Sequence, residues 1–197
     1  MENKTRIDVM CDIETLGTKS DSTIFQIAAI AFDIKTGEYI ETFNEIADIS
    51  QCDDLKITGS TLKWWLKTNK DLFSTLLHSG TMNPKQLLGK FRDFLKGLNS
   101  SKTKDSQVYL WGNGILFDNK MIQTQLESNG MSYPICYRND RDMRTLVDLA
   151  IQKLKLNSQK ELLDLYNEPN LIAHDAFDDV KQQINVACKC YNLLIGD

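Results

Sequence analysis

Three apolar segments with the pattern of β-strands occupy the first fifty residues, and this early run of strands constrains the fold more than any other feature. Ile7–Cys11 is a short apolar run that ends at Asp12, which is typical of a buried strand. Ile24–Phe32 is apolar except at Gln26, and Tyr39–Ile46 alternates after a Thr-Gly turn. The three segments therefore predict a meander of neighbouring strands.

After these strands the spacing of apolar residues changes to three and four, which indicates amphipathic helices. The predicted helices are Thr61–Leu66, Pro84–Leu98, Phe117–Leu126, Met143–Leu154 and Asp175–Leu194. Val108–Trp111 is the fourth predicted strand and Tyr133–Tyr137 the fifth, whereas Asn157–Asn170 has no clear pattern. Strands followed by alternating helices and strands predict an α/β sheet with helices packed on it.

Composition narrows the class of protein. The chain has 197 residues, of which 42% are apolar and 25% charged, as expected of one globular domain. Its net charge of −4 excludes a strongly basic nucleic-acid coat, but not an enzyme with a local basic surface. No apolar run reaches the roughly 18 residues that span a bilayer, and no signal-peptide core follows the N-terminus. Five scattered cysteines without a Cys-x-x-Cys pair argue against structural zinc and predict a cytoplasmic protein with reduced thiols.

Two carboxylates follow the first predicted strand. Asp12 and Glu14 are two positions apart, so their side chains point the same way in an extended segment. Buried carboxylates repel each other and need a neutralising cation, and hard divalent ions prefer oxygen ligands. The pair predicts a metal site, although a loop with two solvated acids has the same sequence pattern.

Further polar residues are expected at the same edge of the sheet. Asp118 follows the fourth predicted strand and a Gly-Asn-Gly turn, His174 precedes the C-terminal helix, and Asp179 lies about one turn inside that helix. Each also has a simpler explanation, because acids in the first turn of a helix are favoured by the helix dipole. From these residues alone, both interpretations stay open.

Three motifs together resemble the DnaQ-like 3′–5′ exonucleases in their DEDDh form. They are Asp12–Gly17 (Asp-Ile-Glu-Thr-Leu-Gly), Asn113–Asp118 (Asn-x-x-x-Phe-Asp) and His174–Asp179 (His-x-Ala-x-x-Asp). The residues that match the DEDDh signature are Asp12, Glu14, Asp118, Asp179 and His174. Thr61–Leu66 and Arg141–Leu146 resemble the phage exonuclease A and small bacterial exoribonuclease branch. The resemblance implies a mixed five-stranded ribonuclease H-like sheet with helices on both faces, in a single exonuclease domain over residues 1–197.

The resemblance also implies an activity, which is metal-dependent 3′–5′ hydrolysis of single-stranded RNA or DNA to 5′-mononucleotides. Two Mg²⁺ or Mn²⁺ ions are implied, with Asp12 bridging them, Glu14 and Asp179 completing one ion and Asp118 supporting the other. His174 is the implied general base. Two alternatives stay open at this point. One is a non-catalytic nucleic-acid-binding module on the same scaffold, which would be expected to lack a ligand, and the other is a metal-dependent nucleotide phosphohydrolase.

Substrate contacts are expected near the first two motifs. The resemblance places Thr15 and Leu16 at the terminal base and the 3′-hydroxyl, although Leu16 suits a core position equally well. One of the adjacent Trp64 and Trp65 is expected to stack on a base, and we predict Trp65 for that role, although burial of both rings is an open alternative. Asn113 is expected to orient the second motif or reach the substrate.

The expected partners are the 3′ ends of single-stranded nucleic acids, with no membrane. A homodimer is an expectation from the resemblance alone. Arg144 is either a phosphate contact or an exposed surface arginine. No motif distinguishes RNA from DNA, because that choice depends on a contact to the 2′-hydroxyl.

Overall fold

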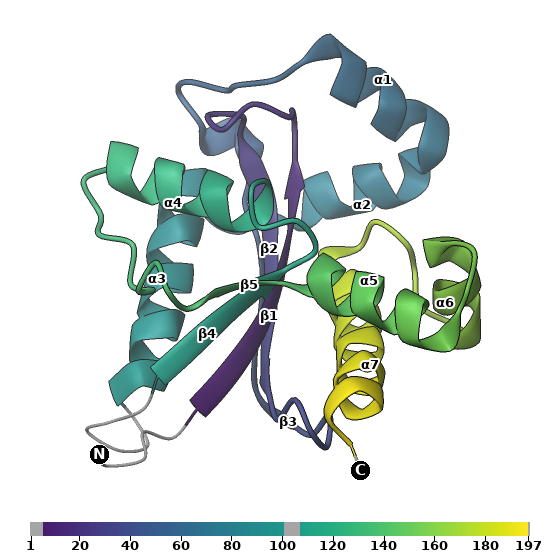
Figure 1. Cartoon of the computed structure of the whole chain (residues 1–197). Coiled ribbons are helices and arrows are strands. Elements are labelled where there is room, and N and C mark those ends of the chain that lie inside the picture. The colour runs from purple at the N-terminus through teal and green to yellow at the C-terminus, as the bar shows by residue number, and fades with distance from the viewer. Residues whose placement is uncertain (1–5, 101–106, 197) are drawn as a thin grey trace.

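The structure is a computed structural model of the chain and describes residues 6–100 and 107–196 (Figure 1). Its strands are β1 (Arg6–Thr15), β2 (Ile24–Phe32), β3 (Tyr39–Ile46), β4 (Gln107–Gly112) and β5 (Asp140–Asp142). Its helices are α1 (Gly59–Thr68), α2 (Lys70–Ser79), α3 (Pro84–Ser100), α4 (Asp118–Ser128), α5 (Met143–Leu154), α6 (Gln159–Leu165), α7 (Ala176–Ile195) and a short 3₁₀ helix at Ile49–Gln51.

The five strands form one mixed sheet in the order β3-β2-β1-β4-β5. β1 pairs with β2 and β2 with β3 in antiparallel fashion, whereas β1–β4 and β4–β5 are parallel. This arrangement confirms the predicted mixed five-stranded sheet and makes β1 its central strand. A central strand is desolvated on both faces, so any polar residue that it carries needs a specific partner.

Helices cover both faces of the sheet, as predicted, with α3 and α4 on one face and α5 and α7 on the other (Figure 1). Alternation along β1 divides its side chains between the two layers. Ile7, Val9, Cys11 and Ile13 pack in the layer of α3 and α4, whereas Met10 packs with α5 and α7. The even-numbered acids of β1 therefore face α7.

A third apolar cluster lies at the carboxyl end of β1, where α1 and α2 pack together. Its buried members are Leu16, Phe25, Trp65, Phe73 and Leu76. The pair α1–α2 projects beyond the end of the sheet, above the ends of β1 and β2 in Figure 1. This cluster fixes one wall beside the carboxyl end of the central strand.

The predicted fifth strand at Tyr133–Tyr137 is wrong, because the fifth strand is Asp140–Asp142. Its pairing with β4 is parallel and runs from Leu110 opposite Asp140 to Gly112 opposite Asp142. Tyr133–Tyr137 is irregular, and the Tyr133 hydroxyl donates a hydrogen bond of 2.8 Å to Asp140 Oδ1. Pairing with β4 therefore decides which of the two neighbouring segments becomes the strand.

Two helices were not predicted. α2 begins after Asn69, whose side chain accepts a hydrogen bond from the Leu72 amide, and it buries Phe73 and Leu76. α6 lies in the segment without a clear sequence pattern. Within the described ranges, no helix combines the length and hydropathy that a membrane span requires.

Candidate active site

The central strand β1 carries the acidic pair itself and does not end before it. Asp12 lies opposite Ala28 and Glu14 opposite Gln26 on β2, and the ladder shifts register between Glu14 and Thr15. Both carboxylates lie on the α7 side of the sheet. Glu14 is buried and Asp12 is partly buried, so the site starts with two carboxylates largely removed from water.

Asp118 is the first residue of α4 and is buried. Its approach to the sheet depends on Gly112, the last residue of β4. A Cβ atom at Gly112 would lie 2.7 Å from Asn119 Oδ1 and 3.3 Å from Asp118 Oδ2. A side chain there would push the start of α4 away, so glycine allows Asp118 to lie next to the strand end.

Asp179 and His174 come from the start of α7 and the loop before it. The His174 backbone amide donates a hydrogen bond of 3.0 Å to Asp179 Oδ2, and His174 has a left-handed φ of 69°. Such a φ is costly for a non-glycine residue and is retained only where surrounding contacts fix it. One potential ligand atom from each of Glu14, His174 and Asp179 lies within 4.8 Å of the other two.

The pKa values of the four acids are all raised. Burial raises the pKa of Asp12 and of Glu14 well above the ordinary range, and repulsion from neighbouring acids adds to both shifts. Burial also raises the pKa of Asp118 to about 7 and the pKa of Asp179 above its ordinary value. Within residues 6–100 and 107–196, no lysine or arginine makes an ion pair with any of the four.

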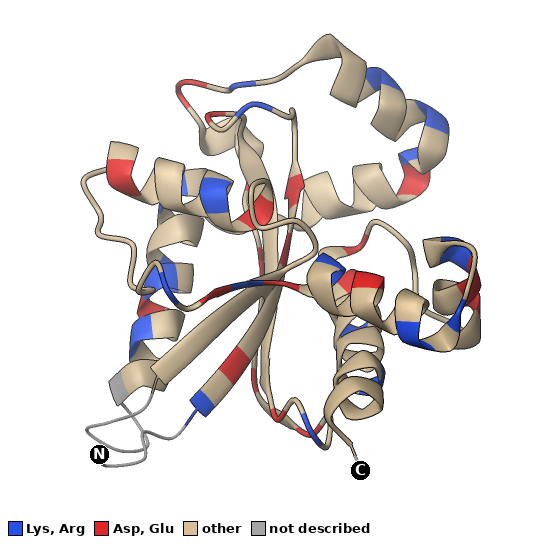
Figure 2. Ribbon diagram, viewed as in Figure 1, with Lys and Arg blue, Asp and Glu red and all other residues tan. Residues whose placement is uncertain are grey.

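Figure 2 shows the acidic segments at the end of β1 and the start of α4 close together at one end of the sheet. The carboxylates form a set of oxygen donors without a protein cation, and one histidine lies beside them. This donor set suits a hard divalent metal ion. The residues predicted to form the DEDDh signature are therefore brought together.

A cavity of about 490 Å³ opens beside Glu14, between the end of β1 and α1. Its lining residues are Ile13, Glu14, Thr15, Thr18, Ser60, Thr61, Trp64, Trp65 and Phe117. The volume lies within the range of small-molecule sites, roughly 300–1,000 Å³. Of the four acids, Glu14 lines this cavity, so a molecule bound there can reach the acidic site at Glu14.

The prediction that Trp65 stacks on a base is wrong. Trp65 is only 1% exposed, its ring stacks on Phe73 with centroids 5.0 Å apart, and its Nε1 donates to the Thr15 carbonyl. Trp64 is 42% exposed and meets the His174 ring edge-on, with centroids 4.8 Å apart. Adjacent helical residues diverge by about 100°, and packing against α2 decides which of the two turns inward.

The predicted base contact of Leu16 is also wrong, because its side chain is buried in the cluster with Phe25 and its amide donates to the Thr23 carbonyl. The alternative, a core leucine, is what the structure contains. Thr15 lines the cavity, but its hydroxyl donates to the Gly17 carbonyl. At this end of β1, both side chains serve to hold the loop in place.

Asn113 and Arg144 lie together near Asp118. Arg144 Nε donates to Asn113 Oδ1 over 3.3 Å, and the Arg144 charge opposes the rise in the pKa of Asp118. Arg144 is exposed, so its guanidinium can meet a ligand from solvent. Both roles predicted for Asn113, to orient the second motif or to reach the substrate, stay predictions.

One residue of the site was missed. Gln183 of α7 is 7% exposed, and its Nε2 donates a hydrogen bond of 2.8 Å to Asp12 Oδ1. Its only sequence signal is its position four residues after Asp179, which places both on one helix face. A neutral amide at that spacing is common on helices, so the pattern alone does not mark it.

Comparison with known proteins identifies the family. The sequence model of the 3′-5′ exoribonuclease Rv2179c-like domain matches residues 7–191, nearly the whole chain. The chain belongs to this family. It is therefore a 3′–5′ exonuclease, and the predicted DnaQ-like DEDDh resemblance is confirmed.

Comparisons with individual proteins agree with this family. The Rv2179c-like chain is 25% identical to the exodeoxyribonuclease of Enterobacteria phage T4, over 90% of this chain and 86% of the relative. Its structure resembles the zinc-bound E. coli ExoI–ssDNA complex, with a TM-score of 0.66, 19% identity and 93% of this chain matched, but it spans only 40% of that protein. It also resembles the nuclease domain of 3′hExo, a DEDDh family member bound to rAMP, with a TM-score of 0.62, 16% identity, and 96% and 92% of the two chains covered. At these identities the structural likenesses confirm the fold.

Proposed function

We propose that this exonuclease removes 5′-mononucleotides from the 3′ end of single-stranded nucleic acid with the help of two Mg²⁺ or Mn²⁺ ions. The observation that carries the proposal is the set of four convergent acids without a protein cation, beside a histidine and a cavity of about 490 Å³. Such a set is costly to bury unless positive charge arrives from outside. A metal-dependent site explains why the fold retains it.

The residues present fit this metal pair. Asp12, on the central strand, is proposed to contact both ions, with Glu14 and Asp179 on one and Asp118 on the other. Ions of this kind supply charge that stabilises the attacking and leaving oxygens of a phosphodiester. They also let an acidic protein accept a phosphate anion, because four carboxylates and two dications leave little net charge.

His174 is the proposed general base. Within the described part of the chain its ring nitrogens make no hydrogen bond, so one nitrogen can accept a proton from water. The backbone contact to Asp179 and the edge-on contact to Trp64 hold the residue beside the acids without occupying those nitrogens. A positioned base of this kind typically contributes about 10²–10⁴-fold in rate.

Substrate binding is proposed at the cavity. Trp64, in place of Trp65, offers an exposed ring for stacking on a base, a contact that tolerates any sequence. Arg144, held by Asn113 next to Asp118, is proposed to contact a phosphate. Support for nucleic acid comes from relatives described as an ExoI–ssDNA complex and as a nuclease bound to rAMP.

Both RNA and DNA belong in the test, because the family is described as an exoribonuclease and the phage relative as an exodeoxyribonuclease.

A non-catalytic binding module is disfavoured by the complete set of acids and histidine. A nucleotide phosphohydrolase would use the same acids but act only on free nucleotides. The single domain over residues 1–197, the cytoplasmic location and the homodimer stay predictions.

The test is digestion of matched 3′-labelled and 5′-labelled RNA and DNA oligonucleotides with Mg²⁺, Mn²⁺ or EDTA. We expect 5′-labelled substrate to give a ladder that shortens from the 3′ end, and 3′-labelled substrate to release 5′-mononucleotide at once. EDTA should abolish both. Intact oligonucleotides in Mg²⁺ and Mn²⁺, or undiminished cleavage in EDTA, would contradict the proposal.

A further inference from the structure

Gln183 is a neutral side chain that holds Asp12, a predicted metal ligand. It lies on α7 one helical turn after Asp179, and its Nε2 donates to Asp12 Oδ1 over 2.8 Å. Among buried side chains of the described residues, its Oε1 stands out because it has no hydrogen-bond partner. A buried amide that is bonded at one end and unpartnered at the other calls for an explanation.

We propose that Gln183 is a positioning residue, which orients the Asp12 carboxylate for the metal ions. The inference rests on the proposed function, because it assigns Asp12 to the metal pair. Gln183 itself touches neither substrate nor ions in this account. It acts through Asp12.

The orientation of the amide follows from simple chemistry. The ionised Asp12 carboxylate, which is the form that binds metal, only accepts hydrogen bonds, so it selects the NH₂ end of the amide and repels its oxygen. That choice leaves Oε1 facing away without a partner, which costs stability in a buried setting. An apolar side chain of the same length would avoid this cost, so packing alone does not account for a glutamine here.

The contact also restricts rotation of the carboxylate. Asp12 Oδ1 is engaged by Gln183, and no hydrogen bond to Oδ2 is found in the described part of the chain. One oxygen is thus fixed while the other stays open. The hydrogen bond opposes the rise in the pKa of Asp12 that burial and the neighbouring acids cause.

The placement on α7 couples two ligands. Asp179 and Gln183 are four residues apart on one helix face, so the helix that supplies one acid also fixes the acid of β1. A small rotation of α7 would move both groups together. Partners that orient metal ligands in this way commonly contribute about 10–100-fold to metal affinity.

The experiment compares Gln183→Met, which keeps the length without the hydrogen bond, with Gln182→Met on the same helix. Gln182 bonds to the Tyr166 carbonyl and the Glu168 amide, away from the acids, and serves as the matched control. Mn²⁺ binding to the substrate-free protein is measured by calorimetry, and melting temperature is measured in EDTA. A Gln183→Asn variant, which shortens the reach of the amide, gives a second test with a conservative change.

We expect Gln183→Met and Gln183→Asn to bind Mn²⁺ about 10–100-fold more weakly than wild type. The melting temperature of Gln183→Met in EDTA should be unchanged or higher, and kcat should fall even at saturating Mn²⁺ while KM stays the same. Gln182→Met should bind Mn²⁺ as the wild type does.

Wild-type Mn²⁺ affinity in Gln183→Met, or a lowered melting temperature as its only defect, would overturn this inference alone. Failure of the wild-type protein to bind Mn²⁺ would overturn the proposed function and this inference with it.

Discussion

Asp8 and Asp12 lie on the same face of β1 but have different kinds of hydrogen-bond partner. Asp8 is 2% exposed, and its carboxylate accepts from Arg6 at 2.7–3.0 Å and from Trp111 Nε1 at 2.7 Å. Four residues further along, Asp12 accepts a side-chain hydrogen bond from the neutral amide of Gln183 and, among residues 6–100 and 107–196, from no charged group. One strand thus carries an acid that the protein neutralises itself and an acid that it does not.

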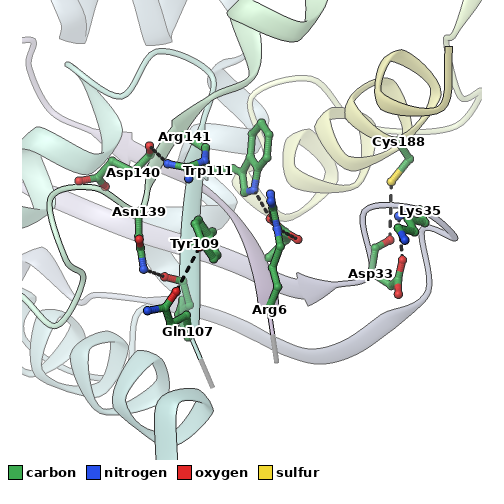
Figure 3. Close-up of polar contacts among 12 residues, drawn as sticks. Arg6, Asp33, Lys35, Gln107, Tyr109, Trp111, Asn139, Asp140, Arg141 and Cys188 are labelled. Carbon is green, nitrogen blue, oxygen red and sulfur yellow. Dashed lines mark hydrogen bonds and ion pairs between the residues drawn. The ribbon is translucent and has the colours of Figure 1, made fainter. Parts of the chain in front are cut away.

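The surroundings of Asp8 add to this difference. The Tyr109 ring lies between the guanidiniums of Arg6 and Arg141, at 4.5 Å and 4.6 Å from its centroid, and holds both in place (Figure 3). The Asp12 end of the strand has acids where the Asp8 end has arginines. We infer that Asp8 serves the fold and that Asp12 and Glu14 serve a cation from outside the chain.

The largest expected effect is a loss of activity on substitution of Asp12, which we do not expect at Asp8. Asp12→Asn should reduce turnover by several orders of magnitude, because it removes the proposed ligand to both ions. Its melting temperature in EDTA should stay level or rise, since one of several mutually repelling acids is gone. Near wild-type hydrolysis of a labelled oligonucleotide by this variant would remove Asp12 from the mechanism.

His174→Ala tests whether the histidine belongs to the chemistry or only caps the loop. We expect a loss of about 10²–10⁴-fold in single-turnover rate with Mn²⁺ affinity within a few-fold of wild type. A merely structural histidine would give a lower melting temperature and an unchanged rate in the folded enzyme. Measuring rate, metal affinity and melting on one preparation distinguishes the two.

Stability without metal should depend on pH because of the acids at the Asp12 end. Folding raises the pKa of Asp118 from 3.8 to about 7, and the pKa values of Asp12 and Glu14 also rise. The folded state then holds protons that the unfolded chain releases near pH 4. The contribution of these acids to stability is therefore largest below about pH 4 and is lost as pH rises toward 7.

Asp118→Asn should remove part of this slope, on the order of a few kcal/mol between pH 4 and 8. Urea unfolding in EDTA across that range measures it. An Asp118→Asn variant whose stability falls as steeply as that of wild type would show that the carboxyl is not strained by folding.

The smallest effect is expected at Asp8. Asp8→Asn should cost about 1–3 kcal/mol of stability, because Arg6 and Trp111 lose a charged acceptor. This loss of stability is modest because the Arg6 side chain is 42% exposed and solvent screens its charge. Activity of the folded variant should match wild type, and a large loss of turnover would break the distinction between the two ends of β1.

The acids of the site could be predicted because their placement follows from strand alternation and from matches to known motifs. β2, β3 and α5 were predicted with the bounds that the structure shows, since each is a long apolar or periodic segment. The confirmed elements are those whose local pattern and tertiary role agree.

The misses share a cause, which is that packing rather than local sequence decided them. β5 is three polar residues that become a strand only through pairing with β4. Trp65 turns inward because Phe73 of α2 offers a stacking partner, and nothing within α1 distinguishes it from Trp64. Gln183 was missed because its partner Asp12 is 171 positions away in the sequence.

The central claim is that divalent ions neutralise the acids that β1 leaves without a protein cation. Calorimetric titration of Mn²⁺ into the EDTA-stripped, dialysed protein at pH 6.5, in buffers of different ionisation enthalpy, tests it most directly. We expect two bound ions and a net release of about one proton or more, because acids with raised pKa values must lose their protons to bind metal. Absence of Mn²⁺ binding, or binding with no proton release, would contradict it.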